Sequence, residues 1–295
     1  MSYKRSLDLF NKLLKENTMN NFAEKYGPWA LVTGASSGIG QEMATQLAAK
    51  GLNVVIVARR QNLLDSLKEK LMAKYNVEVL ALQADFYQKN AAKKIEEITC
   101  KLDIGLVIPN AGAEMVGEFV DGDVNENTAL VQLNTVTPMQ IANMFGPRLK
   151  KRGRGGMLFV SSLFGYQGIP YVANYAATKA YILGLGEALN VELGKYGVDV
   201  SVLSPGLTAT EMPANMPINF KKIPMFSMKT SRAARAGLSA LGNKATVVPG
   251  LLNKIYAWEN RFIPRTWPVS LFGFLIRRAL THDRKPIPHL DMADS

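Results

Sequence analysis

The sequence contains one cysteine, Cys100, and two histidines, His282 and His289, among 295 residues. A single cysteine excludes an internal disulfide bond and fits a reducing compartment. Both histidines lie in the polar C-terminal tail, so the ligands of a zinc site and the parts of a Ser-His-Asp triad are missing. Metal-dependent hydrolysis is therefore excluded, and we expect no metal site.

A long apolar run is also missing. The longest, residues 267–276, contains Pro268 and Gly273 and is much shorter than the roughly 18 residues that a membrane-spanning helix needs. At the N-terminus, Lys4 and Arg5 are followed by charged and polar residues, which does not resemble a secretory signal. We therefore expect a cytoplasmic protein.

Acidic residues are scarce near the C-terminal end. Residues 221–285 hold only Glu259 and Asp283 among many Lys, Arg, Trp and Phe residues, in a chain of net charge +11. This pattern predicts either a solvated basic face over an ordinary core, or contact with an anionic membrane surface or an acidic substrate tail. No nucleic-acid-binding motif accompanies the charge, so we expect no nucleic acid partner.

Short apolar runs rich in branched residues alternate with helical patterns. This alternation predicts a parallel sheet covered by helices on both faces, an α/β fold. The expected strands are Trp29–Thr33, Asn53–Ala58, Val77–Leu82, Ile104–Ile108, Met157–Ser161, Val198–Leu203 and Ala245–Val248.

The chain divides into three predicted parts: an N-terminal helical extension over residues 1–27, a main domain over 28–250, and a basic, apolar extension over 251–295. The first extension could pack on the core, self-associate or touch a membrane, and the sequence leaves these open. Within the main domain, residues 211–226 combine prolines with methionines. They cannot form a regular helix throughout, and we interpret them as an adaptable lid.

A glycine-rich turn follows the first expected strand directly and leads into a helix, as a phosphate-binding turn requires. Gly34 permits a tight turn, Gly38 lets the backbone approach a pyrophosphate, and Gly40 lets helix and strand pack closely. The expected contacts to a dinucleotide are Gly34, Ser36, Ser37, Gly38, Ile39 and Gly40.

Tyr175 and Lys179 lie four residues apart in an expected helix, and so on one helical face. A free phenol titrates near pH 10, but the ammonium, helped by an oxidised nicotinamide ring, is expected to lower that pKa toward neutrality. Alone, the pair would be an ordinary surface pair. Together with the glycine turn, whose spacing is Gly-x-x-x-Gly-x-Gly after Thr33, it resembles the short-chain dehydrogenase/reductase family.

The end of the second strand bears on the choice of cofactor. An NAD enzyme would place an acid there to hold the ribose 2′-hydroxyl, whereas this chain has Ala58 followed by Arg59. The guanidinium of Arg59 can pair with a 2′-phosphate and stack on the adenine. We therefore expect NADP(H) rather than NAD(H), although Arg59 could also be a plain arginine at a helix start.

The resemblance implies roles for residues after the third and fourth strands. Asp85 matches the acid that accepts a hydrogen bond from the adenine amino group, with a helix N-cap as the alternative. Asn110, Ala111 and Gly112 match the end of the family's Asn-Asn-Ala-Gly. Pro109 replaces the first Asn, which leaves the local hydrogen bonding open.

Ser162 stands thirteen residues before the tyrosine, at the family's spacing for the serine that holds the substrate oxygen. Ser161 is its competitor, and strand alternation would point only one of them into the pocket. Asn134 matches the family's helix asparagine that supports a water leading to the lysine. Pro138 lacks an N–H, so it leaves the carbonyl of Asn134 without its usual helical partner; a simple proline kink is the alternative.

The loop after the sixth strand resembles the family's Pro-Gly loop that receives the nicotinamide carboxamide. Its expected contacts are Pro205 and Gly206, the backbone of Thr208 and the hydroxyl of Thr210. A plain turn would explain Pro-Gly but not the whole ordered set of motifs.

The resemblance covers residues 28–250 and implies a doubly wound, seven-stranded Rossmann fold. Residues 25–30 resemble the branch of hydroxysteroid dehydrogenases and long-chain 3-ketoacyl reductases. The implied reaction is hydride transfer between NADPH and an apolar ketone or secondary alcohol, with Tyr175 exchanging the proton, in a homodimer or homotetramer. A non-catalytic nucleotide-binding scaffold or redox sensor is the alternative, but it need not retain Ser162, Tyr175 and Lys179 together.

Overall fold

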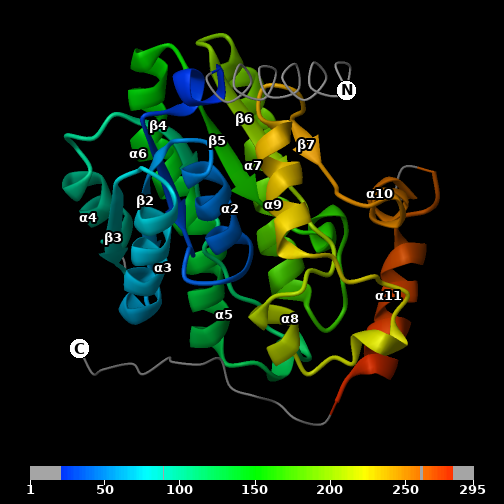
Figure 1. Cartoon of the computed structure of the whole chain (residues 1–295). Coiled ribbons are helices and arrows are strands. Elements are labelled where there is room, and N and C mark those ends of the chain that lie inside the picture. Colours follow the sequence, from blue (N-terminus) through cyan, green and yellow to red (C-terminus); the bar gives the residue numbers. More distant parts are fainter. Residues whose placement is uncertain (1–20, 89, 260–261, 282–295) are drawn as a thin grey trace, which may run out of the picture.

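The computed structural model describes residues 21–88, 90–259 and 262–281, and its centre is one parallel sheet (Figure 1). The strand order is β3-β2-β1-β4-β5-β6-β7, and every strand pair is parallel. The strands are β1 (Trp29–Thr33), β2 (Asn53–Ala58), β3 (Val79–Gln83), β4 (Ile104–Ile108), β5 (Gly155–Val160), β6 (Val198–Leu203) and β7 (Thr246–Val247). The seven expected strands and the Rossmann fold are confirmed; the bounds of β1, β2, β4 and β6 match, and the ends of β3, β5 and β7 differ by one or two residues.

Alternate residues of the central strands face two separate cores, which is why these strands read as nearly continuous apolar runs. Val32 and Ile56 pack in one core with Met43 of α2, whereas Leu31 and Val55 pack in the other, with helices α4, α6 and α7. Figure 1 shows these helices covering both faces of the sheet. The longer helices are α2 (Gly38–Ala48), α3 (Gln61–Lys74), α4 (Ala91–Ile98), α5 (Val124–Val131), α6 (Thr137–Arg152), α7 (Ala173–Gly194) and α9 (Thr230–Ala240).

Strand order reverses between β1 and β4, because the chain leaves β1 toward β2 on one side and later returns to β4 on the other. Ligands of doubly wound sheets bind beside such a reversal, at the carboxyl ends of the strands. In Figure 1 this edge is at the bottom, where α5 and α8 (Glu211–Asn215) lie.

The segment over 211–226 contains only two short turns, α8 and the 3-10 turn Phe220–Lys222, so the prediction of an irregular segment is confirmed. After β7 the chain forms α10 (Leu251–Trp258) and α11 (Thr266–Ala279). Phe272 and Ile276 of α11 pack against Tyr175 and Phe164 in a third apolar cluster. The last helices therefore complete the wall of the main domain.

Three predictions concern residues outside the described ranges: the apolar face of residues 1–20, the positions of His282 and His289, and the end of the basic extension. Among described residues, no helix is long and apolar enough to cross a bilayer. No group of His, Cys, Asp or Glu suited to a metal ion occurs in that same part of the chain.

Candidate active site

A cavity of about 1330 Å³ opens at the carboxyl ends of β1, β4 and β5. Single small ligands usually occupy about 300–1,000 Å³, so the cavity has room for a dinucleotide and a second molecule. All predicted site residues line it except Gly40 and Asn134. The sequence-predicted residues, which are spread over more than 170 positions of the chain, thus converge on one site.

The glycine turn forms one end of the cavity. Gly34 and Gly38 have φ of 67° and 61°, the left-handed region that favours glycine. A Cβ on Gly34 would lie 2.8 Å from the Cα of Ala111, and one on Gly40 would collide with the carbonyl of Gly34. Gly40 therefore permits close packing rather than contact with a ligand, while the open turn before α2 fits a pyrophosphate.

Pro109 does not disturb the strand end that follows β4. The hydroxyl of Thr33 accepts hydrogen bonds from the backbone N–H groups of Asn110 and Ala111, both at 3.0 Å. The side-chain amide of Asn110 donates to the Thr33 carbonyl at 2.9 Å. Asn110 thus ties β4 to the glycine turn, which answers the question left open by the missing first Asn.

Asp85 lines the cavity but does not cap a helix, so the N-cap alternative is wrong. Helix α4 begins at Ala91 with Asn90 as its N-cap. Asp85 instead accepts a hydrogen bond from the backbone N–H of Tyr87 at 3.1 Å. Residues 86–88 turn away between Asp85 and the helix, and Asp85 stays at the cavity wall.

Two arginines, Arg59 and Arg60, follow β2 and line the cavity. The Arg59 guanidinium lies over the Tyr87 ring, 5.4 Å from its centre. Arg60 donates to the hydroxyls of Ser37 at 2.9 Å and Ser36 at 3.2 Å. Only Arg59 was predicted from the sequence. The contact of Arg60 with Ser36 and Ser37 joins positions that are far apart in the sequence, so no local pattern indicates it.

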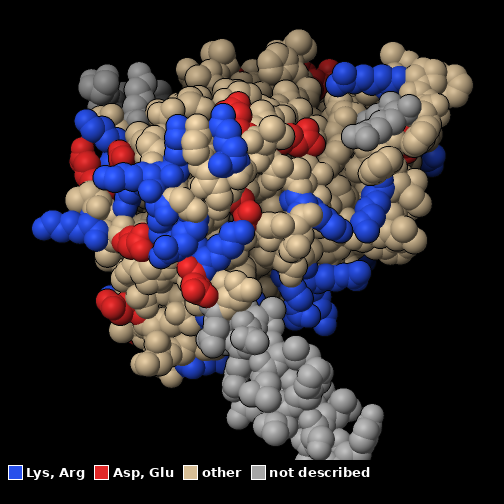
Figure 2. All heavy atoms as spheres, turned by 90° about the horizontal axis from the view of Figure 1, so that it is seen from above, with Lys and Arg blue, Asp and Glu red and all other residues tan. Residues whose placement is uncertain are grey.

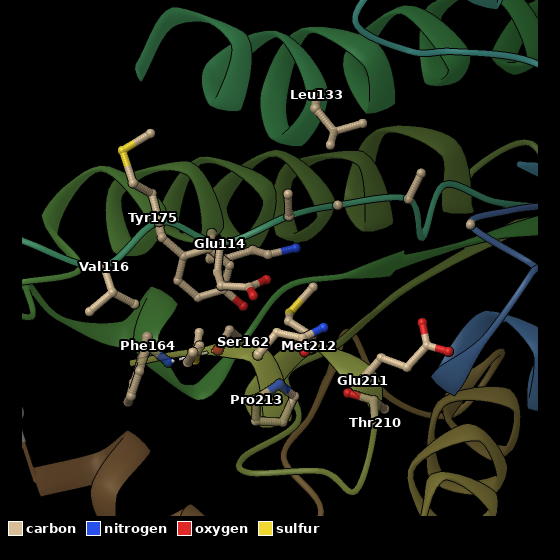
Figure 3. Close-up of a pocket in the computed structure, with 18 of the residues that line it drawn as sticks. Glu114, Val116, Leu133, Ser162, Phe164, Tyr175, Thr210, Glu211, Met212 and Pro213 are labelled. Carbon is tan, nitrogen blue, oxygen red and sulfur yellow. Dashed lines mark hydrogen bonds between the residues drawn. The ribbon is translucent and has the colours of Figure 1, made fainter. Parts of the chain in front are cut away.

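Tyr175, Lys179 and Ser162 all line the cavity, and Figure 3 shows the Tyr175 side chain directed toward Ser162. Tyr175 and Ser162 share a side-chain hydrogen bond. Lys179 Nζ donates to the Val160 carbonyl at 3.0 Å and lies 5.7 Å from the centre of the Tyr175 ring. Ser161 also borders the cavity, but its hydroxyl donates to the backbone carbonyl of Lys179 at 2.7 Å, so Ser162 is the serine whose hydroxyl remains beside Tyr175.

Asn134 stands behind this centre in a π-helical turn, residues 132–136. Its side-chain amide donates to the carbonyl of Ala113 at 2.8 Å and to the hydroxyl of Thr178 at 3.1 Å. Its side-chain oxygen accepts from the Ala113 N–H at 3.0 Å. The side chain of Asn134 thus holds the loop after β4 against α7. This role is additional to the helix kink expected at Pro138.

Burial sets the pKa values at the centre of the cavity. It raises the pKa of Tyr175 to about 12; the hydrogen bond with Ser162 opposes that rise, and the Glu114 carboxylate adds to it. Burial lowers the pKa of Lys179 to about 8. The sequence predicts a lowered pKa for Tyr175, but desolvation of the phenolate outweighs the neighbouring groups of the chain.

Glu114 is a site residue that the sequence analysis missed. It lines the cavity, and Figure 3 shows its carboxylate directed toward Tyr175 and Ser162. Burial raises its pKa to about 7, against its own backbone hydrogen bond and the charge of Lys179. The available signal was an acidic residue two positions after Gly112 in an otherwise apolar stretch.

The loop after β6 closes the cavity. The Thr208 hydroxyl donates to the Gly206 carbonyl at 3.0 Å, which fixes the loop and leaves its backbone on the cavity wall. Thr210 lies opposite the glycine turn, since a Cβ on Gly38 would come within 3.1 Å of its methyl group. The Pro205 carbonyl accepts from the N–H of Leu163, so this loop and the strand end that carries Ser162 are joined.

Comparison with known proteins agrees with this geometry. The sequence model of the short chain dehydrogenase family matches residues 28–219. The chain belongs to the short-chain dehydrogenase/reductase family, a family of oxidoreductases.

Individual relatives match over most of the chain. It is 30% identical to a 7beta-hydroxysteroid dehydrogenase of Clostridium sardiniense, covering 86% of this chain and 97% of the relative. It is 32% identical to a very-long-chain 3-oxoacyl-CoA reductase of Podospora anserina, covering 85% of this chain and 71% of the relative. Both belong to the branch that residues 25–30 resemble.

Solved structures give the same result. A structure from work on 7beta-hydroxysteroid dehydrogenase stereoselectivity superposes with a TM-score of 0.79 at 29% identity, over 85% of this chain and 99% of that chain. A short-chain dehydrogenase from Sphingobium yanoikuyae in complex with NADPH gives 0.73 at 31% identity, over 80% and 92%.

Proposed function

We propose that this protein transfers hydride between NADP(H) and an apolar ketone or secondary alcohol, with Tyr175 as the group that exchanges the proton. The observation that carries the proposal is the convergence of Tyr175, Ser162 and Lys179 in the same cavity as the glycine turn. A scaffold without turnover would not require these three side chains together, and this convergence favours the enzyme over that alternative.

The cavity fits a nicotinamide dinucleotide. Gly34 and Gly38 leave the turn before α2 open to a pyrophosphate, and the loop of Pro205, Gly206, Thr208 and Thr210 lines the far wall. When bound, the nicotinamide supplies or accepts the hydride. All other proposed steps are carried out by residues of this chain.

In the direction of reduction, the substrate carbonyl oxygen accepts hydrogen bonds from the hydroxyls of Ser162 and Tyr175, which polarise the carbonyl. Tyr175 then gives its proton to that oxygen. Lys179, held by the Val160 carbonyl, stabilises the phenolate that remains. Asn134 keeps the loop after β4 in place beside Lys179. Its backbone carbonyl is the proposed site for a water that extends a proton relay from Lys179.

The 2′-phosphate of NADP(H) is held by Arg59 and Arg60. The end of β2 offers Ala58 in place of a carboxylate, so nothing there repels the phosphate. Arg60 already donates to Ser36 and Ser37, and Arg59 lies over Tyr87 in a position to stack on adenine. Asp85 completes this end by accepting from the adenine amino group.

The substrate is an apolar carbonyl compound that is steroid-like or a 3-oxoacyl compound. The wall beside Tyr175 is formed by apolar side chains, namely Val116, Leu133, Phe164, Met212 and Met216. Residues 211–226 act as the lid over this wall, since flexible Met side chains adapt to different apolar ligands. The relatives' names, a hydroxysteroid dehydrogenase and a 3-oxoacyl-CoA reductase, support the same two substrate classes.

The functional unit is a homodimer or homotetramer in the cytoplasm. Support for self-association comes from family habit and from exposed apolar side chains on the helices that flank the site, with Val124 of α5 and Val191 of α7 71% and 76% exposed. Gel filtration with light scattering tests this assembly. A monomer at all protein concentrations would contradict it.

A ketone panel with NADPH and with NADH tests the proposed reaction, followed at the nicotinamide absorbance. The wild type is expected to reduce at least one bulky apolar ketone and to prefer NADPH. Ser162→Ala is expected to lower kcat by about a hundredfold because one polarising hydroxyl is lost. Ser161→Ala is the matched control, since the Ser161 hydroxyl is engaged with the backbone carbonyl of Lys179 rather than with the substrate oxygen. Equal losses in both variants would contradict the assigned geometry.

A further inference from the structure

Helix α10 exposes its apolar side. Leu251 and Ile255 are 78% and 55% exposed, and their spacing of four places them on one helical face. The opposite side is buried through Asn253 and Ala257. A surface helix of a globular protein normally buries its apolar stripe, so the outward stripe of α10 calls for another explanation.

Helix α11 repeats the pattern. Trp267, Leu271 and Phe274 lie at i, i+4 and i+7 and are 65%, 53% and 46% exposed. Phe272 and Ile276 of the same helix are buried, so α11 has one apolar face toward the core and another toward solvent. Phe262, between the two helices, is 78% exposed. These exposed residues form the α10–α11 surface: Leu251, Ile255, Phe262, Trp267, Leu271 and Phe274.

Basic side chains accompany this surface. Lys254 extends from α10, and Arg277 and Arg278 form the last turn of α11. The Arg278 guanidinium lies 5.2 Å from the centre of the Phe274 ring, so charge and aromatic side chain are adjacent. Among described residues from 251 to 281 the only acid is Glu259, whose pKa is raised by burial.

The sign of the charge decides between two occupants of the α10–α11 surface. In a twofold dimer this surface would meet itself, and its cations would face like cations. An anionic bilayer instead offers headgroups for Lys254 and Arg277 and an apolar interior for Trp267 and Leu271. A contact of this kind lies in the interface of the bilayer and needs no helix that spans it.

The α10–α11 surface also borders the substrate side of the cavity. Phe272 of α11 packs edge-on against Phe164, a residue of the cavity wall, with ring centres 6.3 Å apart. The lid is joined to the end of α11, because the Asn219 N–H donates to the Ala279 carbonyl at 2.8 Å and Lys222 Nζ to the Arg278 carbonyl at 3.4 Å. Figure 1 shows α10 and α11 together along one side of the molecule, beyond β7.

We propose that the α10–α11 surface docks this protein peripherally on an anionic lipid bilayer. The apolar stripes of both helices enter the headgroup region, and Lys254, Arg277 and Arg278 bind lipid phosphates. Docking brings the lid beside the phase in which an apolar substrate is concentrated. This inference does not require the proposed reaction, because binding to a bilayer can be measured without turnover.

A second basic face of the same molecule provides the control. Figure 2, seen from above, shows the end of the molecule opposite the cavity, where Lys and Arg side chains lie among Asp and Glu side chains. Lys150 and Lys151 belong to the last turn of α6 and carry charge without an apolar stripe of this kind. If charge alone drove binding, both faces would contribute equally.

The test is co-sedimentation of the full-length protein with vesicles of phosphatidylcholine, alone or mixed with phosphatidylglycerol. The wild type is expected to sediment with the mixed vesicles and at least tenfold less with pure phosphatidylcholine. Leu251→Ser with Leu271→Ser is expected to weaken binding at least about tenfold, because two apolar side chains no longer enter the bilayer. Met72→Ser with Ile98→Ser, at sites on α3 and α4 that are each 48% exposed, is expected to change it less than twofold.

A second comparison tests the charges. One double variant carries Arg277→Gln and Arg278→Gln, and the other carries Lys150→Gln and Lys151→Gln. The first pair is expected to weaken binding to mixed vesicles at least about tenfold, because two cations no longer bind lipid phosphates, and the second pair less. Equal losses in the two pairs, or no sedimentation of the wild type, would overturn the proposal. Light scattering without lipid adds a further outcome: if Leu251→Ser with Leu271→Ser converts an oligomer to a monomer, the surface binds a second copy instead.

Discussion

Arg60 Nη1 lies 3.0 Å from Glu211 Oε2, an ion pair that joins the end of β2 to the first turn of α8. Arg60 is also one of the two arginines proposed for the 2′-phosphate, so the lid carboxylate and the cofactor phosphate compete for one guanidinium. The side chains of Arg60 and Glu211 are 45% and 58% exposed. At such exposure an ion pair is worth about 0–1 kcal/mol.

Glu211→Gln is therefore expected to strengthen NADPH binding by about two- to fivefold, because Arg60 no longer has a competing carboxylate. NADH binding is expected to stay unchanged, since NADH has no 2′-phosphate. Fluorescence titration of the two cofactors measures both constants. A variant that gained or lost affinity equally for both would show that Glu211 does not compete at the phosphate.

The two arginines make separable contributions. Arg59→Ala and Arg60→Ala are each expected to weaken NADPH binding by about tenfold or more, the loss of a charge-assisted contact. Arg154→Ala, on the strand-start side of the sheet, is the control. The same titrations test both variants. If only Arg59→Ala weakens NADPH binding, the contact of Arg60 with the serines of the turn has no part in cofactor choice.

Glu114 is expected to impose a pH dependence on alcohol oxidation, the direction that needs the Tyr175 phenolate. The Glu114 carboxylate raises the pKa of Tyr175, so Glu114→Gln should lower that pKa and make the phenolate more available. Because the pKa of Glu114 is about 7, the wild type carries this charge only above that pH. The ratio of variant to wild-type kcat/KM should therefore be near one below about pH 6 and rise about three- to tenfold across pH 7.

Glu118→Gln serves as the control for this profile, because Glu118 also lines the cavity but is exposed. Its ratio to wild type should stay flat over the same range. A flat ratio for Glu114→Gln as well would mean that the carboxylate does not act on the reacting phenol.

Two glycines of α7 should respond in opposite ways to the same substitution. A Cβ on Gly186 would collide with Val202 of β6 and lie 3.3 Å from Phe159, whereas nothing lies within 4 Å of a Cβ on Gly184. Gly186→Ala is expected to lower the free energy of unfolding by about 1–3 kcal/mol. Gly184→Ala is expected to leave it unchanged or raise it by up to about 1 kcal/mol, through higher helix propensity. Denaturant unfolding of both variants measures this, and equal effects would contradict the packing of α7 on the sheet.

The fold could be predicted from sequence because the central strands are buried on both faces. Runs such as 53–58 and 198–203 are short, apolar and branched, and their bounds agree with β2 and β6. The glycine turn and the Tyr175–Lys179 spacing placed the site for a similar reason, since both are local patterns with a fixed geometry. Strand alternation indicated that only one of Ser161 and Ser162 could present its hydroxyl to the site, and the Ser161 hydroxyl is engaged elsewhere.

Other features depended on contacts between distant segments. The role of Arg60 rests on serines more than twenty residues away, and the pKa of Tyr175 rests on how deeply the phenol is buried. Glu114 was missed because its place in the cavity is set by the loop that Asn134 holds, not by a pattern in its own segment. The start of α4 at Ala91, and with it the position of Asp85 in a turn, was likewise decided by the tertiary structure.

Single-turnover reduction of a ketone by Tyr175→Phe with NADPH tests the central claim most directly. Loss of the phenol hydroxyl removes the proton donor, so the rate should fall by at least about a hundredfold, while NADPH binding and the unfolding transition should match those of the wild type. A variant that binds NADPH normally and still reduces the ketone at the wild-type rate would contradict the assignment of Tyr175.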